Sequence, residues 1–211
     1  MQKITLIITS LLVSISSYCA EKIRVACVGD SITFGARVKD RGKNSYPAQL
    51  QTLLGEKYKV NNYGVSGRTL LKKGDNPIWR HKAYKNAIAF NPNIVIIKLG
   101  TNDTKPQNWK HKDHFKNDLI AMVKQFQNLA AKPKVYLCKP VPAYQTRWGI
   151  NDKTILEGVI PIVEVVAKEM KLEVIDLYTA LSNKKEMFPD KIHPNAQGAT
   201  VMAETIAKVI K

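Results

Sequence analysis

The chain has 211 residues, of which 45% are hydrophobic and 24% are charged. This composition excludes collagen-like chains, disordered chains and small disulfide scaffolds, and the length suits one domain that buries roughly 70% of its unfolded surface. The charge is unusual, because 33 Lys and Arg against 17 Asp and Glu give a net charge of +16. Such a balance favours acidic partners or substrates, although a diffuse basic surface also occurs in ordinary soluble proteins.

Residues 1–20 have the pattern of a secretory signal. Lys3 lies in a short basic start, and Ile4 to Ile15 is mostly apolar. This stretch is too short to span a bilayer comfortably, so we expect a cleaved signal peptide, a domain over residues 21–211, and a periplasmic or extracellular protein. An uncleaved anchor is the alternative. Cys19 only faintly resembles a lipoprotein cleavage site, and we expect no stable membrane partner unless it is lipidated.

The rest of the chain alternates short apolar runs with longer amphipathic stretches. The runs are rich in Val, Ile, Leu and Tyr, which predicts the strands Ile23–Val28, Lys59–Tyr63, Ile94–Leu99, Lys134–Cys138 and Glu173–Ile175. Helical spacing of apolar residues predicts the helices Tyr46–Leu54, His81–Phe90, Phe115–Leu129, Ile155–Met170 and Ala196–Ile210. Strands that alternate with helices form βαβ units, so we expect one α/β domain with a parallel sheet and helices on both faces. Nothing in the pattern indicates an oligomeric state.

Two cysteines, Cys27 and Cys138, lie inside predicted strands, where a free thiol behaves as a small hydrophobe. We therefore expect two buried free thiols, with a disulfide as the alternative in an exported protein. No Cys/His spacing indicates a structural zinc. His111 and His114 fit the solvated start of a helix better than a metal site. We expect no metal and no cofactor.

Ligands of open parallel sheets bind beyond the carboxyl ends of the strands, so the residues that follow each strand are the candidates for a site. Ser31 follows the first strand in Gly-Asp-Ser and is either a nucleophile with a nearby base or a helix cap. Gly64 follows the second strand, where it supplies an N–H to a ligand oxygen or merely permits a turn. Asn102 follows the third strand as an amide donor or an Asx turn.

His193 lies just before the last predicted helix, and Asp190 precedes it by three residues. If the loop curls, the carboxylate can orient the imidazole, whose other nitrogen is then free to deprotonate Ser31. Asp-x-x-His is common by chance, but its combination with the three earlier positions is not. Asn102-Asp103-Thr104 is also a glycosylation sequon, and a catalytic Asn could not carry a glycan, so this role fits bacterial export.

These four blocks, in this order, resemble the SGNH (GDSL-type) hydrolase family from about Arg24 to Ala203. The only departure is Ile32, where the motif usually has Leu. The resemblance implies a three-layer α/β/α flavodoxin-like fold with a five-stranded parallel sheet, and metal-free ester hydrolysis. By the same resemblance, the nucleophile, base and orienting acid are Ser31, His193 and Asp190, and the oxyanion hole comprises Ser31, Gly64 and Asn102.

Three tryptophans, Trp79, Trp109 and Trp148, fall in loops at the predicted active end of the sheet. Exposed aromatic rings suit the faces of sugars, whereas a lipid site would contain more Leu, Ile and Phe; the alternative is that the tryptophans only pack the loops. Several cations lie in or near these loops and favour an acidic saccharide or are simply solvated: Arg68, Lys72, Lys73, Arg80, Lys105, Lys139 and Arg147. Among these residues, the three tryptophans, Arg147 and Arg68 are the predicted substrate contacts.

The stretches that begin at Gly64 and Lys98 resemble a bacterial subgroup often associated with sialate or polysaccharide O-acetylesterases. We therefore expect a secreted serine esterase that removes O-acetyl groups from carbohydrates. A lysophospholipase or a broad acyl-ester hydrolase is the second hypothesis, and a non-catalytic glycan-binding module is the third. Nucleic-acid binding would rest on charge alone, and we expect none.

Overall fold

The computed structural model describes residues 21–211. The predicted signal peptide and Cys19 lie outside these residues. Five strands form one parallel sheet in the order β2-β1-β3-β4-β5. Their bounds are β1 Ile23–Gly29, β2 Tyr58–Gly64, β3 Ile94–Lys98, β4 Lys134–Lys139 and β5 Glu173–Asp176. All five predicted strands are confirmed, each within one residue at either end.

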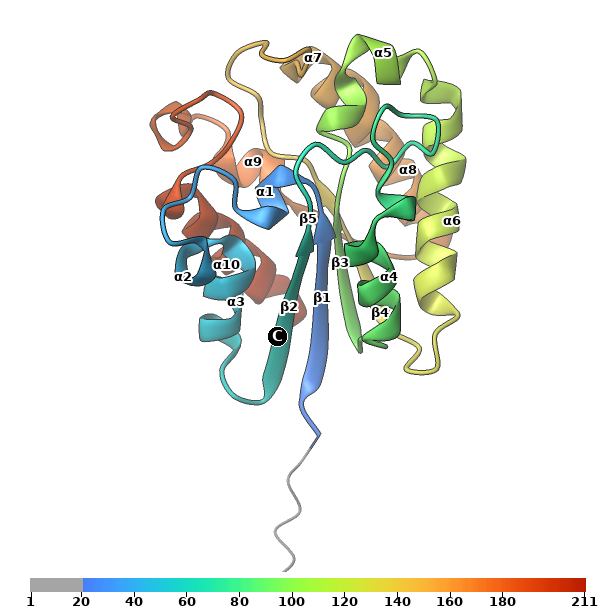
Figure 1. Cartoon of the computed structure of the whole chain (residues 1–211), viewed down its shortest axis with the longest axis vertical. Helices are drawn as coiled ribbons and strands as arrows, with labels where there is room; N and C mark the ends of the chain where they lie inside the picture. Colours follow the sequence, from blue (N-terminus) through green and yellow to red (C-terminus); the bar gives the residue numbers. More distant parts are fainter. Residues whose placement is uncertain (1–20) are drawn as a thin grey trace, which may run out of the picture.

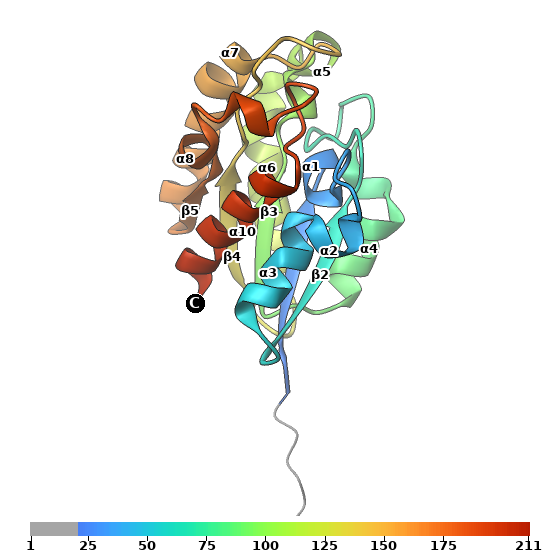
Figure 2. The same ribbon diagram turned by 90° about the vertical axis from the view of Figure 1, so that its left-hand side faces the viewer.

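Helices cover both faces of the sheet (Figure 1). The helices are α1 Ser31–Phe34, α2 Arg41–Asn44, α3 Tyr46–Leu54, α4 Lys82–Ala89, α5 Pro106–Trp109, α6 Phe115–Gln127, α7 Asp152–Thr154, α8 Ile160–Met170, α9 Leu177–Leu181 and α10 Ala196–Ile210. Helices α4, α6 and α8 contribute to one buried cluster, and α3, α9 and α10 contribute to the other. Figure 2 shows α3 and α10 lying across one face of the sheet. The predicted three-layer α/β/α architecture is therefore confirmed.

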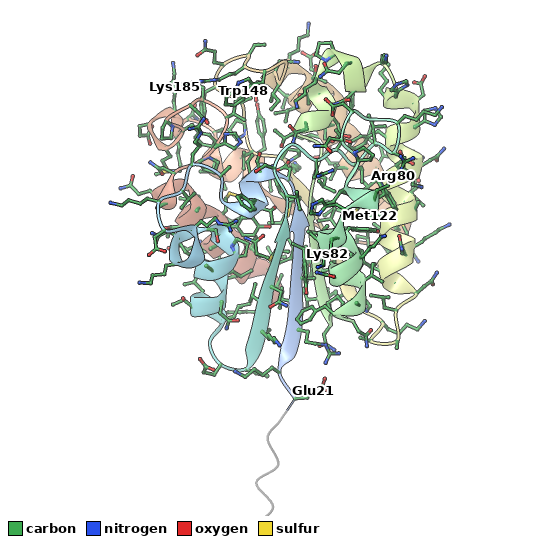
Figure 3. The ribbon with its side chains drawn as sticks, viewed as in Figure 1. Glu21, Arg80, Lys82, Met122, Trp148 and Lys185 are labelled. Atoms are coloured by element: carbon green, nitrogen blue, oxygen red, sulfur yellow. The ribbon has the colours of Figure 1, made fainter. Side chains whose placement is uncertain are left out.

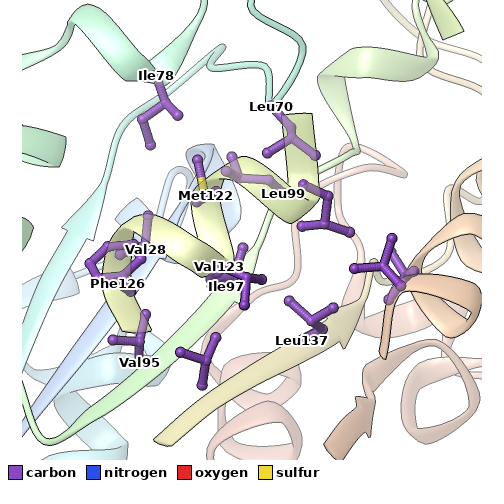
Figure 4. Close-up of a cluster of buried hydrophobic side chains, with 14 of the residues drawn as sticks. Val28, Leu70, Ile78, Val95, Ile97, Leu99, Met122, Val123, Phe126 and Leu137 are labelled. Atoms are coloured by element: carbon purple, nitrogen blue, oxygen red, sulfur yellow. The ribbon is translucent and has the colours of Figure 1, made fainter. Parts of the chain in front are cut away.

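The central strand β3 is continuously apolar because helices cover both of its faces. Val95 and Ile97 belong to one buried cluster, whereas Ile96 between them belongs to the other. Successive side chains of a strand point to opposite faces, so all three are removed from water. Figure 4 shows Met122 and Phe126 of α6 in the cluster that contains Val95 and Ile97.

The predicted helix over residues 155–170 differs from the structure. Residues Ile155–Val159 form a π-helical turn, and the α-helix α8 begins only at Ile160. Pro161 in the first turn of α8 has no N–H and cannot donate to the carbonyl four residues earlier, so it separates the two segments. The expected amphipathic face survives, because Ile155, Val159 and Val163 are all buried.

Both cysteines are free and buried, as predicted. Cys27 on β1 and Cys138 on β4 face the same cluster as α3 and α10. Burial raises the pKa of the Cys138 thiol to about 12, and it also raises the pKa of Cys27. Neither thiol is therefore a nucleophile at neutral pH.

Candidate active site

The carboxyl ends of β1 and β3 and the loop before α10 bring Ser31, Asn102 and His193 into one pocket of about 220 Å³. We call this cavity the Ser31 pocket. Its lining residues are Ser31, Ala36, Ser66, Gly67, Asn102, Lys105, Trp148, Ile150 and His193. Ligands are expected at this end of an open parallel sheet.

Ser31 is the first residue of the short helix α1, directly after β1. Asp30 caps this helix, because its Oδ1 accepts a hydrogen bond from the Ile32 N–H at 2.9 Å. The turn is tight at Gly29, where a Cβ would lie 2.6 Å from the Lys98 carbonyl oxygen and also clash with Thr33. Gly29 therefore permits the tight turn that places Ser31 directly after β1. Because Ser31 begins α1, its backbone N–H is one of the donors that have no partner within the helix.

His193 joins Ser31 to Asp190. Its Nε2 lies 2.8 Å from Ser31 Oγ, and its Nδ1 lies 2.8 Å from Asp190 Oδ2. The other carboxylate oxygen accepts the backbone N–H groups of Ile192 at 3.0 Å and His193 at 2.7 Å, which curls the loop as the sequence suggested. Partial burial favours the protonated acid, but these hydrogen bonds outweigh it, and the pKa of Asp190 lies below its usual value.

Asn102 projects its side chain toward the same pocket from the turn after β3. Its Nδ2 donates to the Arg68 carbonyl oxygen at 3.1 Å, and the backbone carbonyl oxygen of Asn102 accepts from Asn108 Nδ2 at 2.9 Å. An amide nitrogen carries two hydrogens, so one N–H of Asn102 is still available to a ligand in this arrangement.

The assignment of Gly64 to the pocket is wrong. Its N–H donates to Asn62 Oδ1 at 2.9 Å, and a Cβ on it would clash with the backbone of Thr33 and Phe34, so it packs beneath α1. Gly67, three residues later, lines the pocket instead with a φ of +77°. Within residues 21–211 its N–H donates to no other group. The second glycine of the loop was the signal that the sequence analysis passed over.

The sequence pattern also contains no indication of the buried ion pair between Lys98 and Asp30, which lies behind Ser31. Lys98 and Asp30 are both completely buried, and the ammonium lies 3.1 Å and 3.2 Å from the two carboxylate oxygens and 2.8 Å from Thr101 Oγ1. Burial lowers the pKa of Lys98, and the facing Asp30 opposes that shift. Lys98 thus connects the turn that carries Ser31 to the turn that carries Asn102.

Asp103, next to Asn102, anchors the loop after β2. It is fully buried, and its two oxygens accept the N–H groups of Leu70 at 3.1 Å and Leu71 at 2.8 Å. Burial raises the pKa of this carboxyl to about 7 despite these hydrogen bonds. Lys98 at the end of β3 therefore holds the turn of Ser31, and Asp103 just after β3 holds the loop that follows β2.

Of the three tryptophans, only Trp148 lines the Ser31 pocket. The Trp79 indole donates to the Leu70 carbonyl at 2.6 Å and packs against the core. Trp109 packs against the core too, and a Cβ at Gly158 would meet its ring at 2.5 Å. For Trp79 and Trp109, the loop-packing alternative is therefore the correct one.

The basic residues are similarly divided. Lys105 lines the pocket, and Arg147 lies beside Trp148. Four of the other five cations have neighbours of their own: Arg68 donates to Asn76, Lys72 faces Asp118, Lys73 contacts His114, and Lys139 pairs with Glu164 and Asp176. Arg68, a predicted substrate contact, does not line the Ser31 pocket. Its backbone carbonyl oxygen accepts a hydrogen bond from the Asn102 side chain.

Between residues 21 and 211, no three His, Cys, Asp or Glu side chains gather closely enough to hold a metal ion. In the same part of the chain, no helix has the length and apolar character that crossing a bilayer requires.

Comparison with known proteins shows that the chain is similar to esterases. Residues 27–201 match the model of the GDSL-like lipase/acylhydrolase family. An acetylxylan esterase of Xylanibacter ruminicola is 46% identical over 209 residues, which cover 90% of this chain and 44% of that protein. The chain therefore spans less than half the length of that relative.

Two solved structures have the same fold. A carbohydrate acetylesterase of Sinorhizobium meliloti superposes with a TM-score of 0.73 at 23% identity and covers 89% of this chain and 97% of that one. An aryl esterase of M. smegmatis gives a TM-score of 0.72 at 21% identity, with the same coverage. At these identities the likeness establishes the fold.

Proposed function

Because this chain belongs to the GDSL-like lipase/acylhydrolase family, a family of carboxylic ester hydrolases, we propose that it removes O-acetyl groups from carbohydrates through an acyl-enzyme on Ser31. The observation that carries the proposal is the row of hydrogen bonds from Ser31 Oγ through His193 to Asp190, 2.8 Å at each step. A nucleophile, a base and a group that orients the base lie in the geometry that acyl transfer requires.

In the first half of the reaction, Ser31 Oγ bonds to the acetyl carbonyl carbon while its proton passes to His193 Nε2. Asp190 holds the ring through Nδ1 and stabilises the imidazolium that forms. The sugar oxygen then leaves with that proton, so the acetyl group stays on Ser31. In the second half, His193 deprotonates a water molecule, whose oxygen bonds to the acyl carbon. The bond between that carbon and Ser31 Oγ then breaks, His193 returns the proton to Ser31 Oγ, and acetate leaves.

The negative charge that develops on the carbonyl oxygen needs donors on the opposite side of the pocket from His193. We assign this role to the N–H groups of Ser31 and Gly67 and to the side-chain amide of Asn102, all of which line the pocket. One such donor contributes about 3 kcal/mol to lowering the barrier. Asn102→Ala is therefore expected to reduce kcat on the order of 100-fold.

The small volume of the Ser31 pocket supports a short acyl group. Its 220 Å³ and its small lining residues Ala36, Ser66 and Gly67 fit an acetyl group better than a long acyl chain. The similarity to an acetylxylan esterase supports a saccharide as the alcohol part of the ester. Export through residues 1–20, which we also propose, would bring the enzyme to such polymers.

The test measures acetate released by the purified protein from acetylated xylan and acetylated sialic acids, with a long-chain acyl ester for comparison. Ser31→Ala serves as the inactive control. Acetate release from a saccharide that disappears in Ser31→Ala supports the proposal. Hydrolysis of the long-chain ester alone would replace it with a lysophospholipase or broad acyl-ester hydrolase. Undiminished hydrolysis by Ser31→Ala would refute the mechanism.

A further inference from the structure

Trp148 sits at the tip of a two-residue turn beside the Ser31 pocket. Arg147 and Ile150 exchange both backbone hydrogen bonds, at 3.0 Å and 2.9 Å, and the two residues between them have φ values of +53° for Trp148 and +81° for Gly149. Positive φ at both positions suits Asn and Gly, not a bulky aromatic residue. The chain therefore accepts an unfavourable backbone conformation to place an indole at this point.

The indole of Trp148 is exposed to solvent and is not packed against the core. Trp148 is 50% exposed, whereas Trp79 and Trp109 are partly buried against the core. Its ring centroid lies 5.8 Å from that of His193, with 50° between the planes. Figure 3 shows Trp148 at the end of the molecule beyond the strands. A substrate whose ester reaches Ser31 therefore passes along this ring.

Two cations accompany the ring. The Arg147 guanidinium lies 4.5 Å from the Trp148 ring centroid, and Lys105 lines the pocket beside Asn102. Among residues 21–211, no carboxylate lies within 4.0 Å of either cation. The other basic loop residues Lys72 and Lys139, by contrast, form ion pairs.

Four carboxylates at this end of the molecule already accept hydrogen bonds from other groups of the protein. Asp190 binds His193 and has Arg37 at 3.7 Å, and Asp103 is buried against backbone N–H groups. Asp75 accepts from Asn108, and Asp152 accepts from Tyr178 and Ala143. The mouth of the pocket presents an aromatic face and two cations, Lys105 and Arg147, neither of which has an ion-pair partner within 4.0 Å among residues 21–211.

We propose that Trp148, Lys105 and Arg147 form a subsite for a saccharide unit that carries a carboxylate, such as a uronic acid, next to the acetylated sugar. This inference rests on the proposed esterase function. The ring of the sugar stacks on the indole, and the carboxylate pairs with the two cations. The enzyme then prefers acetyl groups of acidic polysaccharides over those of neutral ones.

The test compares two substrates that differ only in charge: an acetylated xylo-oligosaccharide with one glucuronic acid branch, and the same oligosaccharide with a neutral glucose branch at that position. At about 20 mM salt, we expect kcat/KM for acetate release to be about fivefold higher for the acidic substrate, and this preference should fall as salt rises to about 0.5 M. Lys105→Gln should remove most of the preference, through a higher KM for the acidic substrate. Trp148→Ala should raise KM for both.

The matched control is Lys82→Gln, which removes the same charge from the exposed start of α4. It should keep the full preference of the wild-type protein. Equal kcat/KM for the two oligosaccharides would overturn the acidic subsite and leave the esterase proposal standing. Failure to release acetate from either oligosaccharide or from acetylated sialic acids, with Ser31-dependent hydrolysis of 4-nitrophenyl acetate intact, would overturn both.

Discussion

Replacing Lys98 by Met removes the ammonium of the buried ion pair and keeps a side chain of similar length. The Asp30 carboxylate would then remain completely buried with no cation beside it, since Lys98 is the cation within 3.1 Å. Breaking a buried pair from one side costs about 3–5 kcal/mol. For a domain of this size, each kcal/mol lowers Tm by about 2–4 °C, so a fall of roughly 6–20 °C is expected.

The double variant Asp30→Asn, Lys98→Met separates this explanation from simple loss of packing. Asn caps a helix about as well as Asp and carries no charge, so the double variant should recover most of the lost stability. Lys139→Met removes a lysine from the end of the neighbouring strand, where its ion pairs with Glu164 and Asp176 are partly exposed. This control should cost about 1 kcal/mol or less.

Urea unfolding of the four proteins gives the free energies, and hydrolysis of 4-nitrophenyl acetate gives kcat. Lys98 also connects the turns of Ser31 and Asn102 through Thr101, so we expect kcat of the single variant to fall at temperatures where it is still folded. A Lys98→Met protein as stable as the wild type would refute a stabilising role for the buried ion pair. That role is also contradicted if the added Asp30→Asn change restores nothing.

Three further predictions follow from the loops around the pocket. Trp148→Asn creates the Asn-Gly pair preferred in this turn, so stability should rise by about 0.5–1 kcal/mol while KM for saccharides increases; lower stability in thermal melts would contradict the strain at this position. Gly67→Ala keeps the backbone N–H but strains a φ of +77°, so it should displace this donor and lower kcat about tenfold or more. Gly55→Ala, with a similar φ of +75°, should leave kcat unchanged, and equal kcat values for the two variants would contradict a catalytic role for the Gly67 backbone. Asp190 has a lowered pKa in the folded state, so its contribution to stability is present above its unfolded pKa and is lost as pH falls below it. The stability difference between wild type and Asp190→Asn in urea should therefore shrink between about pH 5 and pH 3, and a constant difference would contradict this.

Most of the fold, and the grouping of Ser31, His193 and Asp190, could be predicted from the sequence. The patterns that indicate them are local or occur in a fixed order along the chain. The apolar run of β3 requires cover on both faces, Ser31 is the first residue of α1, and His193 lies in the short loop just before α10. Pro161 interrupts the predicted helix through one missing N–H, a detail that apolar periodicity does not detect.

The errors concern residues whose role depends on distant parts of the chain. Gly64 is the last residue of β2, but Asn62 accepts its N–H, and the loop that follows carries Gly67 into the pocket. Whether a loop tryptophan is buried is decided by partners such as Gly158, which lie far along the sequence. Lys98 ends an apolar strand and looks solvent-exposed until Asp30 is seen beside it.

The most direct test of the account is the mass of the enzyme during turnover. Rapid acid quenching of the protein with 4-nitrophenyl acetate, followed by peptide mass spectrometry, should detect one acetyl group on the peptide that contains Ser31 and none in Ser31→Ala. The same adduct should build up from an acetylated saccharide. An unmodified Ser31 peptide during active turnover, or full activity in Ser31→Ala, would contradict the proposed acyl-enzyme.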